Sequence, residues 1–504
     1  MSTNRTRVTG MYSGLDTESL ITQLVEAKSV KVNDAKKDQM SIKYKQDAWD
    51  ELNKKIKSLY STVSNLQYES AYAKKTTNVS DSSVASVVTA DDAMLSTQTL
   101  KVNKLATSGY LTGARIETQD DTKATSGTLL SKIKGVNVGD TISIEANGKT
   151  KDITITDKMT LGDLTSELSA AGATAKFDTA TQRLFIGAKE SGEKADFSIT
   201  GSADSLKALG LDTSESLPED KRAVKIKGQD AEIELNGAKF TSKTNTFEVN
   251  GLTITAKAQT GKNETVTLDT TNDTSAVYDM IKKFVTEYTS LANELDKLYN
   301  VKADKSYKPL TDDEKAVMSE YEIEKWEDKL KEQALAKDSN VNSVASTLRD
   351  VFNKGFEIGG KTMYLFDFGI EAQNYTEAPE NEKHALHIKG DSDDSVFAND
   401  TNLLQKMITA NPNDVKSFFS QLNHELYTTM GKMSSRVTDT RSFGNFYDDI
   451  KLKNDYSDYN SKITSLEAAL TAYEDKWYDK FSAMEKAMAN MQSNQNAISG
   501  LLGN

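Results

Sequence analysis

The sequence predicts a multidomain α+β protein in which helical terminal regions enclose a β-rich middle. Three observations support this fold class. The chain has 504 residues, which is long enough for several domains. Apolar residues recur at alternating steps of three and four near both chain ends, which is the heptad pattern of a coiled coil. Between the ends, short runs alternate apolar and polar residues, as half-buried strands do.

The N-terminal region predicts helix after residues 1–12. Asp16 or Thr17 is a plausible N-cap, and Leu20 and Leu24 lie on the apolar face that follows. The heptad pattern is weaker through the charged stretch 32–40 and becomes regular over 42–66. The regular seam consists of Trp49, Leu52, Ile56, Leu59, Val63 and Leu66.

The middle of the chain predicts strands, because Ser, Thr, Val, Ala, Asp and Gly dominate over 77–269. Asn236-Gly237 and Asn250-Gly251 separate alternating runs, which indicates two hairpins. One helix is expected over 161–171, after Thr160 as its N-cap and before Gly172. The stretch 126–211 therefore resembles a small α+β domain inserted into a second β-domain.

Helix is expected again from Thr274. Phe284, Tyr288 and Leu291 lie on the apolar face of this return helix. Two further helices are expected over 312–335 and 341–352. A small β-region with a hairpin at Gly359-Gly360 and helical pieces over 403–408, 415–419 and 422–433 complete this part.

The C-terminal stretch 459–502 carries a second heptad seam of more than five repeats. Its members are Ile463, Leu466, Leu470, Tyr473, Trp477, Met484, Ala487, Met491, Ile498 and Leu501, with Lys480 and Asn494 in polar slots. The pattern leaves two interpretations open, a stalk formed with the N-terminal seam or a coil completed by another protein. Tyr473, Trp477 and Phe481 favour a partner, because large aromatic side chains exposed on one helix are costly.

Composition excludes several classes of partner and site. The formal net charge of −13 argues against nucleic acid and against an anionic membrane surface. Without cysteine, the chain has no disulfide, thiolate–metal site or cysteine nucleophile. No apolar stretch approaches the roughly 18 residues of a membrane span, and no apolar signal region follows the N-terminus. We expect neither membrane insertion nor export through a cleaved signal.

Residues with catalytic or metal-binding chemistry are few. His384 and His387 lie on an expected strand, where a spacing of three directs them to opposite faces and away from a shared metal. The acidic run at Asp391 lacks the glycine and the distant glutamate of a calcium loop. Phosphate-binding and nucleophile-elbow motifs are missing. The sequence therefore predicts no enzyme activity, no cofactor and no metal.

Four stretches together resemble one family. Gly14-Leu15-Asp16-Thr17-Glu18-Ser19-Leu20-Ile21 opens the chain, and the stretch 228–237 contains a hairpin signature. The helix near Val277 and the C-terminal residues Phe481 and Met484-Glu485 complete the set. In this order they resemble the bacterial flagellar filament cap family, also called hook-associated protein 2.

The resemblance implies a structural protein at the tip of the flagellar filament. Such a cap retains exported flagellin and promotes its folding and polymerisation. It assembles as a homo-oligomer, a ring of about five copies. The implied partners are flagellin, the hook–filament junction protein and a flagellar export chaperone. The implied location is extracellular, reached through the flagellar type III export system.

The resemblance also divides the chain. The expected parts are terminal coiled-coil legs (1–41 and 455–504), a helical body with a small β-region (42–76 and 270–454), a β-rich head (77–125 and 212–269) and an inserted α+β head domain (126–211). The head would face outward and could serve as an adhesin.

Two sets of side chains are the expected interaction sites. The first would contact filament subunits and the chaperone: Leu15, Leu20, Leu24, Leu466, Leu470, Tyr473, Trp477, Phe481, Met484, Met488 and Met491. The second would join copies: Phe284, Tyr288 and Leu291. Two alternatives stay open, another axial protein such as a flagellin or the junction protein, and a secreted hydrolase. The hairpin signature within 230–255 favours the cap, and no nucleophile–base set favours the hydrolase.

Overall fold

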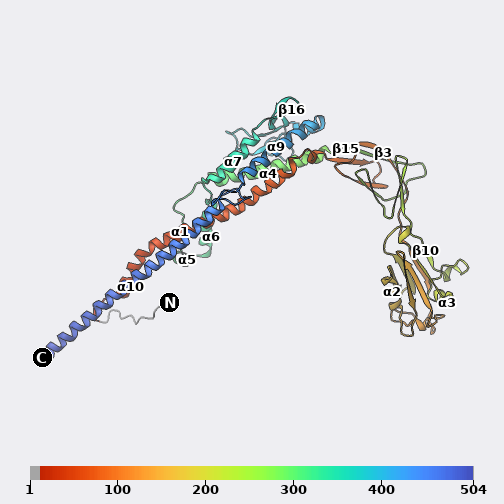
Figure 1. Ribbon diagram of the computed structural model, residues 1–504, viewed down its shortest axis with the longest axis horizontal. Helices are drawn as coiled ribbons and strands as arrows, with labels where there is room; N and C mark the ends of the chain where they lie inside the picture. Colours follow the sequence, from red (N-terminus) through yellow and green to blue (C-terminus); the bar gives the residue numbers. More distant parts are fainter. Residues whose placement is uncertain (1–11, 503–504) are drawn as a thin grey trace. The chain divides into compact units, whose positions relative to one another are not determined.

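The computed structural model describes residues 12–502 and their side chains as far as residue 499. The chain forms two compact units (Figure 1). One combines both ends of the chain, Met1–Tyr72 and Thr274–Asn504, and the other is Ala73–Asp273. We call them the helical unit and the β unit. Long helices in the first and sheets in the second confirm the predicted α+β fold class.

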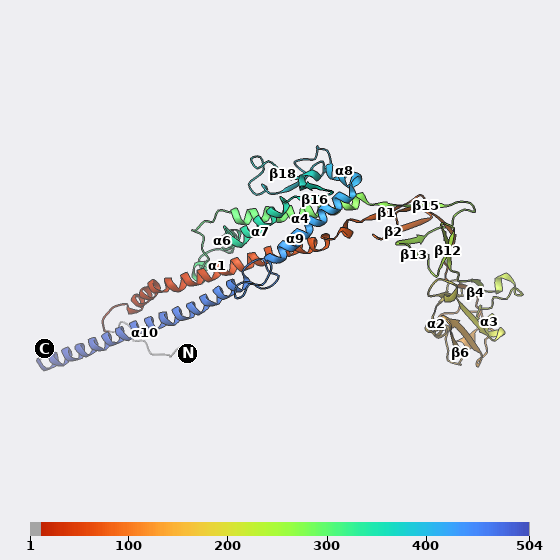
Figure 2. The same cartoon turned by 45° about the horizontal axis from the view of Figure 1, so that its top comes forward.

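The helical unit is built on two long helices from opposite ends of the chain. These helices, α1 and α10, lie side by side in both views (Figures 1 and 2). The helices of the unit are α1 (Thr17–Leu66), α4 (Thr274–Asn300), α5 (Asp312–Ala316), α6 (Glu320–Glu332), α7 (Ser339–Phe352), α8 (Leu403–Ala410), α9 (Pro412–Met433) and α10 (Asp449–Leu502). Two hairpins join β16 (Phe356–Ile358) to β17 (Lys361–Met363) and β18 (Ile370–Ala372) to β19 (Leu386–Ile388).

The core of the helical unit forms around the second half of α1. Trp49, Ile56 and Val63 have no exposed surface, and they belong to one apolar cluster with residues of α4, α7 and α9. The ring of Trp49 also stacks on that of Tyr447, with the centroids 5.0 Å apart. The regular N-terminal seam thus packs against helices that follow Thr274, within the two stretches that the resemblance assigns to one helical body.

The helix expected over 312–335 is instead two helices. The Ser319 side chain accepts a hydrogen bond from the Glu322 backbone N–H, and the Glu322 carboxylate accepts one from the Ser319 N–H. This reciprocal capping box starts α6 at Glu320. The prediction of one helix was wrong because a serine inside a charged helical pattern caps a new helix here.

The first core of the β unit lies between two sheets. The five-stranded sheet has the order β1 (Lys75–Val79), β15 (Val266–Asn272), β3 (Ser96–Lys104), β11 (Ala231–Leu235) and β12 (Ala238–Ser242), and the three-stranded sheet has the order β13 (Thr246–Val249), β14 (Leu252–Ala256) and β2 (Ala85–Thr89). Asn236 and Asn250 have φ angles of 50° and 52°, and a glycine with positive φ follows each. Both predicted hairpins are confirmed, since this geometry suits two-residue turns.

A second core lies in the same unit. One of its sheets has the order β10 (Val224–Ile226), β4 (Tyr110–Arg115), β8 (Arg183–Ala188) and β7 (Ala173–Asp178). The other has the order β6 (Lys149–Thr154), β5 (Thr141–Ala146) and β9 (Phe197–Gly201). The helices α2 (Leu161–Ala170) and α3 (Ala203–Ala208) accompany them, and Thr160 caps α2 as predicted. Leu111 and Ala223 contribute to this core, so the predicted boundaries of the insert at 126 and 211 are too narrow. The division into four domains otherwise stays a prediction.

Candidate partner-binding surface of the terminal helices

The two ends of the chain pair as antiparallel helices. Tyr478 on α10 donates a hydrogen bond to Glu18 at the start of α1 over 2.8 Å, and Lys36 forms an ion pair with Glu467 at 2.7 Å. The residue numbers rise along α1 as they fall along α10, which fixes the antiparallel direction. We call residues 17–41 of α1 together with 455–499 of α10 the leg.

The leg has a thin core. Ile21, Val32 and Ala35 of α1 and Ile463 of α10 are its buried apolar side chains. Two helices bury only the strip between them, so the rest of each apolar stripe stays accessible. The leg therefore contrasts with the second half of α1, which neighbouring helices enclose.

Aromatic side chains of α10 form a run along the leg. The ring centroids of Tyr473 and Trp477 are 6.2 Å apart, and those of Trp477 and Phe481 are 5.9 Å apart. The ammonium of Lys480 lies 4.4 Å from the Trp477 ring, a cation–π contact. The Trp477 indole N–H is covered and has no hydrogen-bond partner among the described residues. The three neighbouring rings therefore give the leg a large apolar surface in a defined arrangement.

The predicted filament and chaperone contacts all lie on the leg or directly before it. Leu15 and Leu20 are exposed, and so is Met491, with 70% of its surface accessible. The others are partly buried: Leu24, Leu466, Leu470, Tyr473, Trp477, Phe481, Met484 and Met488. The structure brings these residues onto one pair of helices, and their role in binding stays a prediction.

Glu485 ties the start of the described chain to α10, and sequence reasoning missed it. Its carboxylate accepts hydrogen bonds from the backbone N–H groups of Tyr12, at 2.9 Å, and Ser13, at 3.3 Å, and from the Ser13 hydroxyl. The hydroxyl and the Tyr12 N–H together hold the pKa of Glu485 below its usual range. One glutamate between Met484 and Lys486 gives no signal of this role.

Beyond Glu485, α10 continues past the start of α1. Met488, Met491 and Ile498 recur at heptad spacing, and the last two are exposed. The stretch 486–499 contains one lysine and no acidic residue. This neutral apolar ridge is the least covered part of the leg.

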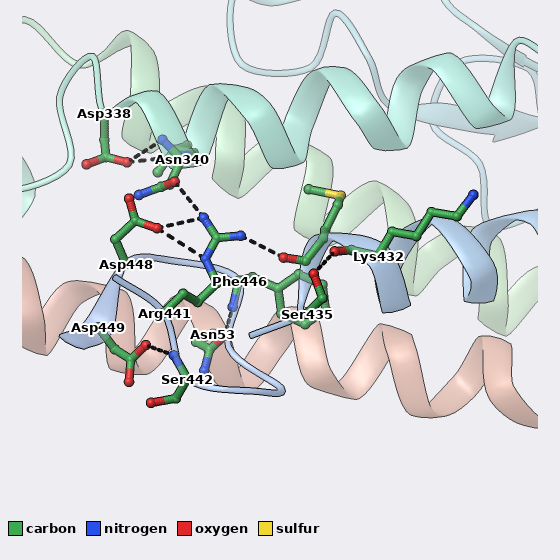
Figure 3. A network of polar contacts seen from close by, with 12 residues as sticks. Asn53, Asp338, Asn340, Lys432, Ser435, Arg441, Ser442, Phe446, Asp448 and Asp449 are labelled. Carbon is green, nitrogen blue, oxygen red and sulfur yellow. Dashed lines mark hydrogen bonds and ion pairs between the residues drawn. The ribbon is translucent and has the colours of Figure 1, made fainter. Parts of the chain in front are cut away.

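A polar network fixes the base of the leg, where the loop between α9 and α10 meets α1 (Figure 3). Arg441 donates hydrogen bonds to Asp448 at 2.7 Å and to the Met433 carbonyl at 2.6 Å. On α1, the buried Asn53 accepts a hydrogen bond from the Phe446 N–H at 3.1 Å and donates one to Asn445 at 3.0 Å. Polar contacts thus order the loop 434–448.

The residues expected to join copies are in a different environment. Phe284, Tyr288 and Leu291 are at most 3% exposed and belong to the core of the helical unit. The ring centroids of Tyr288 and Phe352 lie 3.8 Å apart. These side chains stabilise the fold of one chain, so the expectation that they form an exposed surface for another copy was wrong.

The histidines and the acidic residues make local polar contacts within the chain. His384 contacts Asp296, whereas His387 lies 2.9 Å from Asp394. The ammonium of Lys282 bridges Asp391 and Asp393, which occupies the acidic run that superficially resembled a calcium loop. Within residues 12–499, no group of three or more histidines and carboxylates is placed to hold a metal ion. In the same part of the chain, no helix has the length and apolarity of a membrane span.

Comparison with known families decides the assignment. Residues 228–493, more than half of the chain, match the family described as flagellar hook-associated protein 2 C-terminus, and residues 13–109 match its N-terminal counterpart.

The chain belongs to the flagellar hook-associated protein 2 family. This is a family of structural flagellar proteins and not of enzymes. The family named from the sequence is therefore confirmed, together with its association with the flagellum.

Relatives named flagellar hook-associated protein 2 align along most of the chain. The protein of Halalkalibacterium halodurans is 24% identical over 96% of this chain and 98% of its own length. The A-type protein of Pseudomonas aeruginosa is 25% identical over 80% of this chain and 83% of its own. Among solved structures, the D1-D2-D3 domains of the Escherichia coli flagellar cap protein share 18% identity, cover 77% of this chain and 96% of that one, and give a TM-score of 0.48.

Proposed function

We propose that this member of the hook-associated protein 2 family caps the tip of the bacterial flagellar filament through its leg. The observation that carries the proposal is the apolar ridge of Met488, Met491 and Ile498, which continues the leg beyond its paired part. An amphipathic helix with an uncovered stripe gains stability when another helix completes the seam. The terminal helices of filament subunits are the partner that this surface suits.

The same surface needs protection before assembly. Exposed apolar ridges promote aggregation, so an export chaperone that covers the leg fits its chemistry. In this proposal the protein is exported through the flagellar type III system and contacts the hook–filament junction protein. The absence of cysteine suits a chain that must stay unfolded before export.

The cap acts as a homo-oligomer, a ring of about five copies. It retains exported flagellin at the tip and promotes its folding and polymerisation. In this role the helical unit provides the leg and the contacts between copies. The β unit faces outward and is available as an adhesin, with the exposed Val88, Met94 and Leu95 among its surface residues.

The test uses the full chain in cells that lack their own copy. Met488→Ser, Met491→Ser and Ile498→Ser are combined in one variant, and Val88→Ser with Met94→Ser in the β unit is the matched control. Filament length and flagellin released into the medium are measured. The leg variant is expected to give short filaments and released flagellin, whereas the control resembles the unchanged protein. Normal filaments with the leg variant would contradict the proposal.

A further inference from the structure

A cavity of about 340 Å³ opens on the helical unit beside the β18–β19 hairpin. Its apolar lining includes Tyr288, Phe352, Ile370 and Leu386. This volume is at the low end of ligand sites in proteins, so it admits one or two side chains rather than a whole helix.

The mouth of the cavity carries a stacked aromatic pair. The ring centroids of Tyr364 and Phe366 are 5.3 Å apart with an angle of 7° between the planes. Phe366 leaves 56% of its surface accessible. An accessible aromatic pair beside an apolar cavity is typical of surfaces that receive an apolar side chain from a partner.

Arg349 adds a cation with free donors to the lining. Its Nη1 lies 3.4 Å from the buried carboxylate of Asp296 and 3.2 Å from Nδ1 of His384. Among the described residues, Nε and Nη2 of Arg349 have no hydrogen-bond partner. A guanidinium held on one side and free on the other is suited to a carboxylate from outside.

The charges around the cavity are paired within the chain. Arg349 pairs with Asp296, Lys383 pairs with Glu380 at 3.0 Å, and Glu371 pairs with Lys389 at 2.8 Å. Glu380 is largely exposed, so a carboxylate from outside can replace it beside Lys383. A ligand that combines apolar and acidic side chains therefore matches the lining.

The same unit presents such a segment elsewhere on its surface, over residues 317–324. Val317 is 87% exposed and Tyr321 is 67% exposed. The exposed Glu320 and Glu324 are next to Tyr321 or one helical turn from it. The segment thus displays apolar side chains between carboxylates.

This segment is also held in shape before binding. The capping box at Ser319 fixes the start of α6. The Trp326 indole N–H donates to the Lys308 carbonyl at 2.8 Å, and Lys315 pairs with Glu327 at 2.7 Å. A segment ordered in advance loses little conformational entropy on binding.

We propose that the cavity of one copy receives the 317–324 segment of a second copy of this chain. Tyr321 enters between the aromatic pair and the apolar lining, and Glu320 and Glu324 face Arg349 and Lys383. The contact joins two different surfaces, the cavity of one copy and the 317–324 segment of the next. Each copy therefore has two neighbours, and the chain of copies closes as a ring or continues as a helix. This inference rests on the self-association in the proposed function and names the surfaces involved.

The absence of cysteine allows a direct cross-linking test. Full-length Glu320→Cys and Lys383→Cys proteins, which keep Tyr321 and both rings of the aromatic pair, are mixed, oxidised and separated on a non-reducing gel, and the size of the unmodified protein is measured by light scattering. The mixture is expected to give a cross-linked dimer in at least tenfold higher yield than either variant alone. Glu320→Cys mixed with Phe443→Cys, a residue that is 81% exposed, is the control pair.

A charge reversal tests the same contact without oxidation. Glu320→Lys with Glu324→Lys is expected to raise the concentration for half-association about tenfold, because like charges then face each other. Adding Lys383→Glu is expected to recover part of the association. Arg349 is left unchanged because it also contacts Asp296.

The outcomes separate the inference from the proposed function. Self-association without the specific cross-link, or equal yields from the experimental and control pairs, would overturn the docking contact and leave the cap function standing. A monomer at all accessible concentrations would overturn the contact and also the oligomeric part of the proposed function.

Discussion

The two halves of α1 show how one heptad pattern leads to two environments. Over 49–66 its apolar residues are buried in a core shared with other helices, whereas over 17–41 they face a single partner, α10. The helix runs through both halves without interruption. Local sequence thus determines the helix, and the number of neighbouring helices determines how much stability each apolar residue contributes.

The largest difference between the halves should follow from removing a buried side chain. Ile56→Ala in the body half is expected to lower the free energy of unfolding by about 2–5 kcal/mol, because it leaves a cavity in a closed core. Val30→Ala in the leg half, where the side chain is largely exposed, is expected to change it by about 0.5 kcal/mol or less. Chemical denaturation measures both. Equal losses would remove the distinction between the halves.

A second contrast concerns buried polar contacts at the base of the leg. Asn53→Ala removes the acceptor of the Phe446 N–H and the donor to Asn445. The expected loss is about 1–3 kcal/mol, because a buried N–H is left without a partner. Urea denaturation gives the value, and Asn65→Ala on the exposed side of α1 is the control. An unchanged midpoint would show that the loop does not depend on this contact.

The leg half should respond locally to loss of the Glu485 contact. Glu485→Ala is expected to increase hydrogen exchange at residues 12–20 while the global unfolding midpoint stays within error, because the thin leg opens independently of the core. Asp475→Asn removes another carboxylate of α10 and is the control. Unchanged exchange in the Glu485 variant would contradict the role assigned to it.

The pH dependence of this contact has a defined sign. The folded-state pKa of Glu485 is lowered, so its contribution is present above the unfolded-state value and is lost as pH falls through the folded-state value. Protection of residues 12–20, measured as their exchange rate relative to that of an unfolded chain at the same pH, should therefore fall below about pH 4, where unperturbed glutamates also protonate. A series of exchange measurements at falling pH, compared with Glu485→Ala, tests this. If the Glu485→Ala variant showed the same pH dependence as the unchanged chain, Glu485 would not be the source of that dependence.

The smallest effect is expected for the exposed ion pair between the leg helices. Lys36 and Glu467 are each about half exposed, and pairs of this kind contribute about 0–1 kcal/mol. Lys36→Ala should thus leave both exchange and the unfolding midpoint nearly unchanged. A loss comparable with that of Ile56→Ala would show that charge, and not burial, holds the leg.

Sequence patterns predicted the features that depend on local chemistry. The Asn-Gly hairpins, the Thr160 cap and the apolar face of the Trp49 seam follow from residue type and spacing, and the structure has them. The break at Ser319 was missed because a capping box inside a charged, proline-free stretch looks like continuous helix. The predicted boundaries at 126 and 211 were too narrow, because β4 and β10 lie outside them and still join the second core through long-range strand pairing.

The candidate site was predicted in part. Heptad spacing located the apolar faces of both terminal helices. The regular seam over 49–66 packs in the core and not against the C-terminal seam, so the pairing of α10 with residues 17–41 was implied by the family resemblance and not by matching seams. The Glu485 contact depends on the place where the residues before α1 lie against α10. No local sequence pattern predicts that place. The apolar face of α4 was predicted to contact other copies. Periodicity shows which face of a helix is apolar, but it does not show which part of the molecule packs against that face. Phe284 and Leu291 fill the chain's own core.

The central claim is that the body half of α1 is complete in one chain and the leg is completed by a partner. Hydrogen exchange of the full chain, free and assembled on flagellar filaments, tests it most directly. The free chain is expected to show strong protection over 49–66 and weak protection over 17–41 and 486–499, and only the leg should gain protection on assembly. Equal protection of both halves in the free chain, or a leg unchanged on filaments, would contradict the claim.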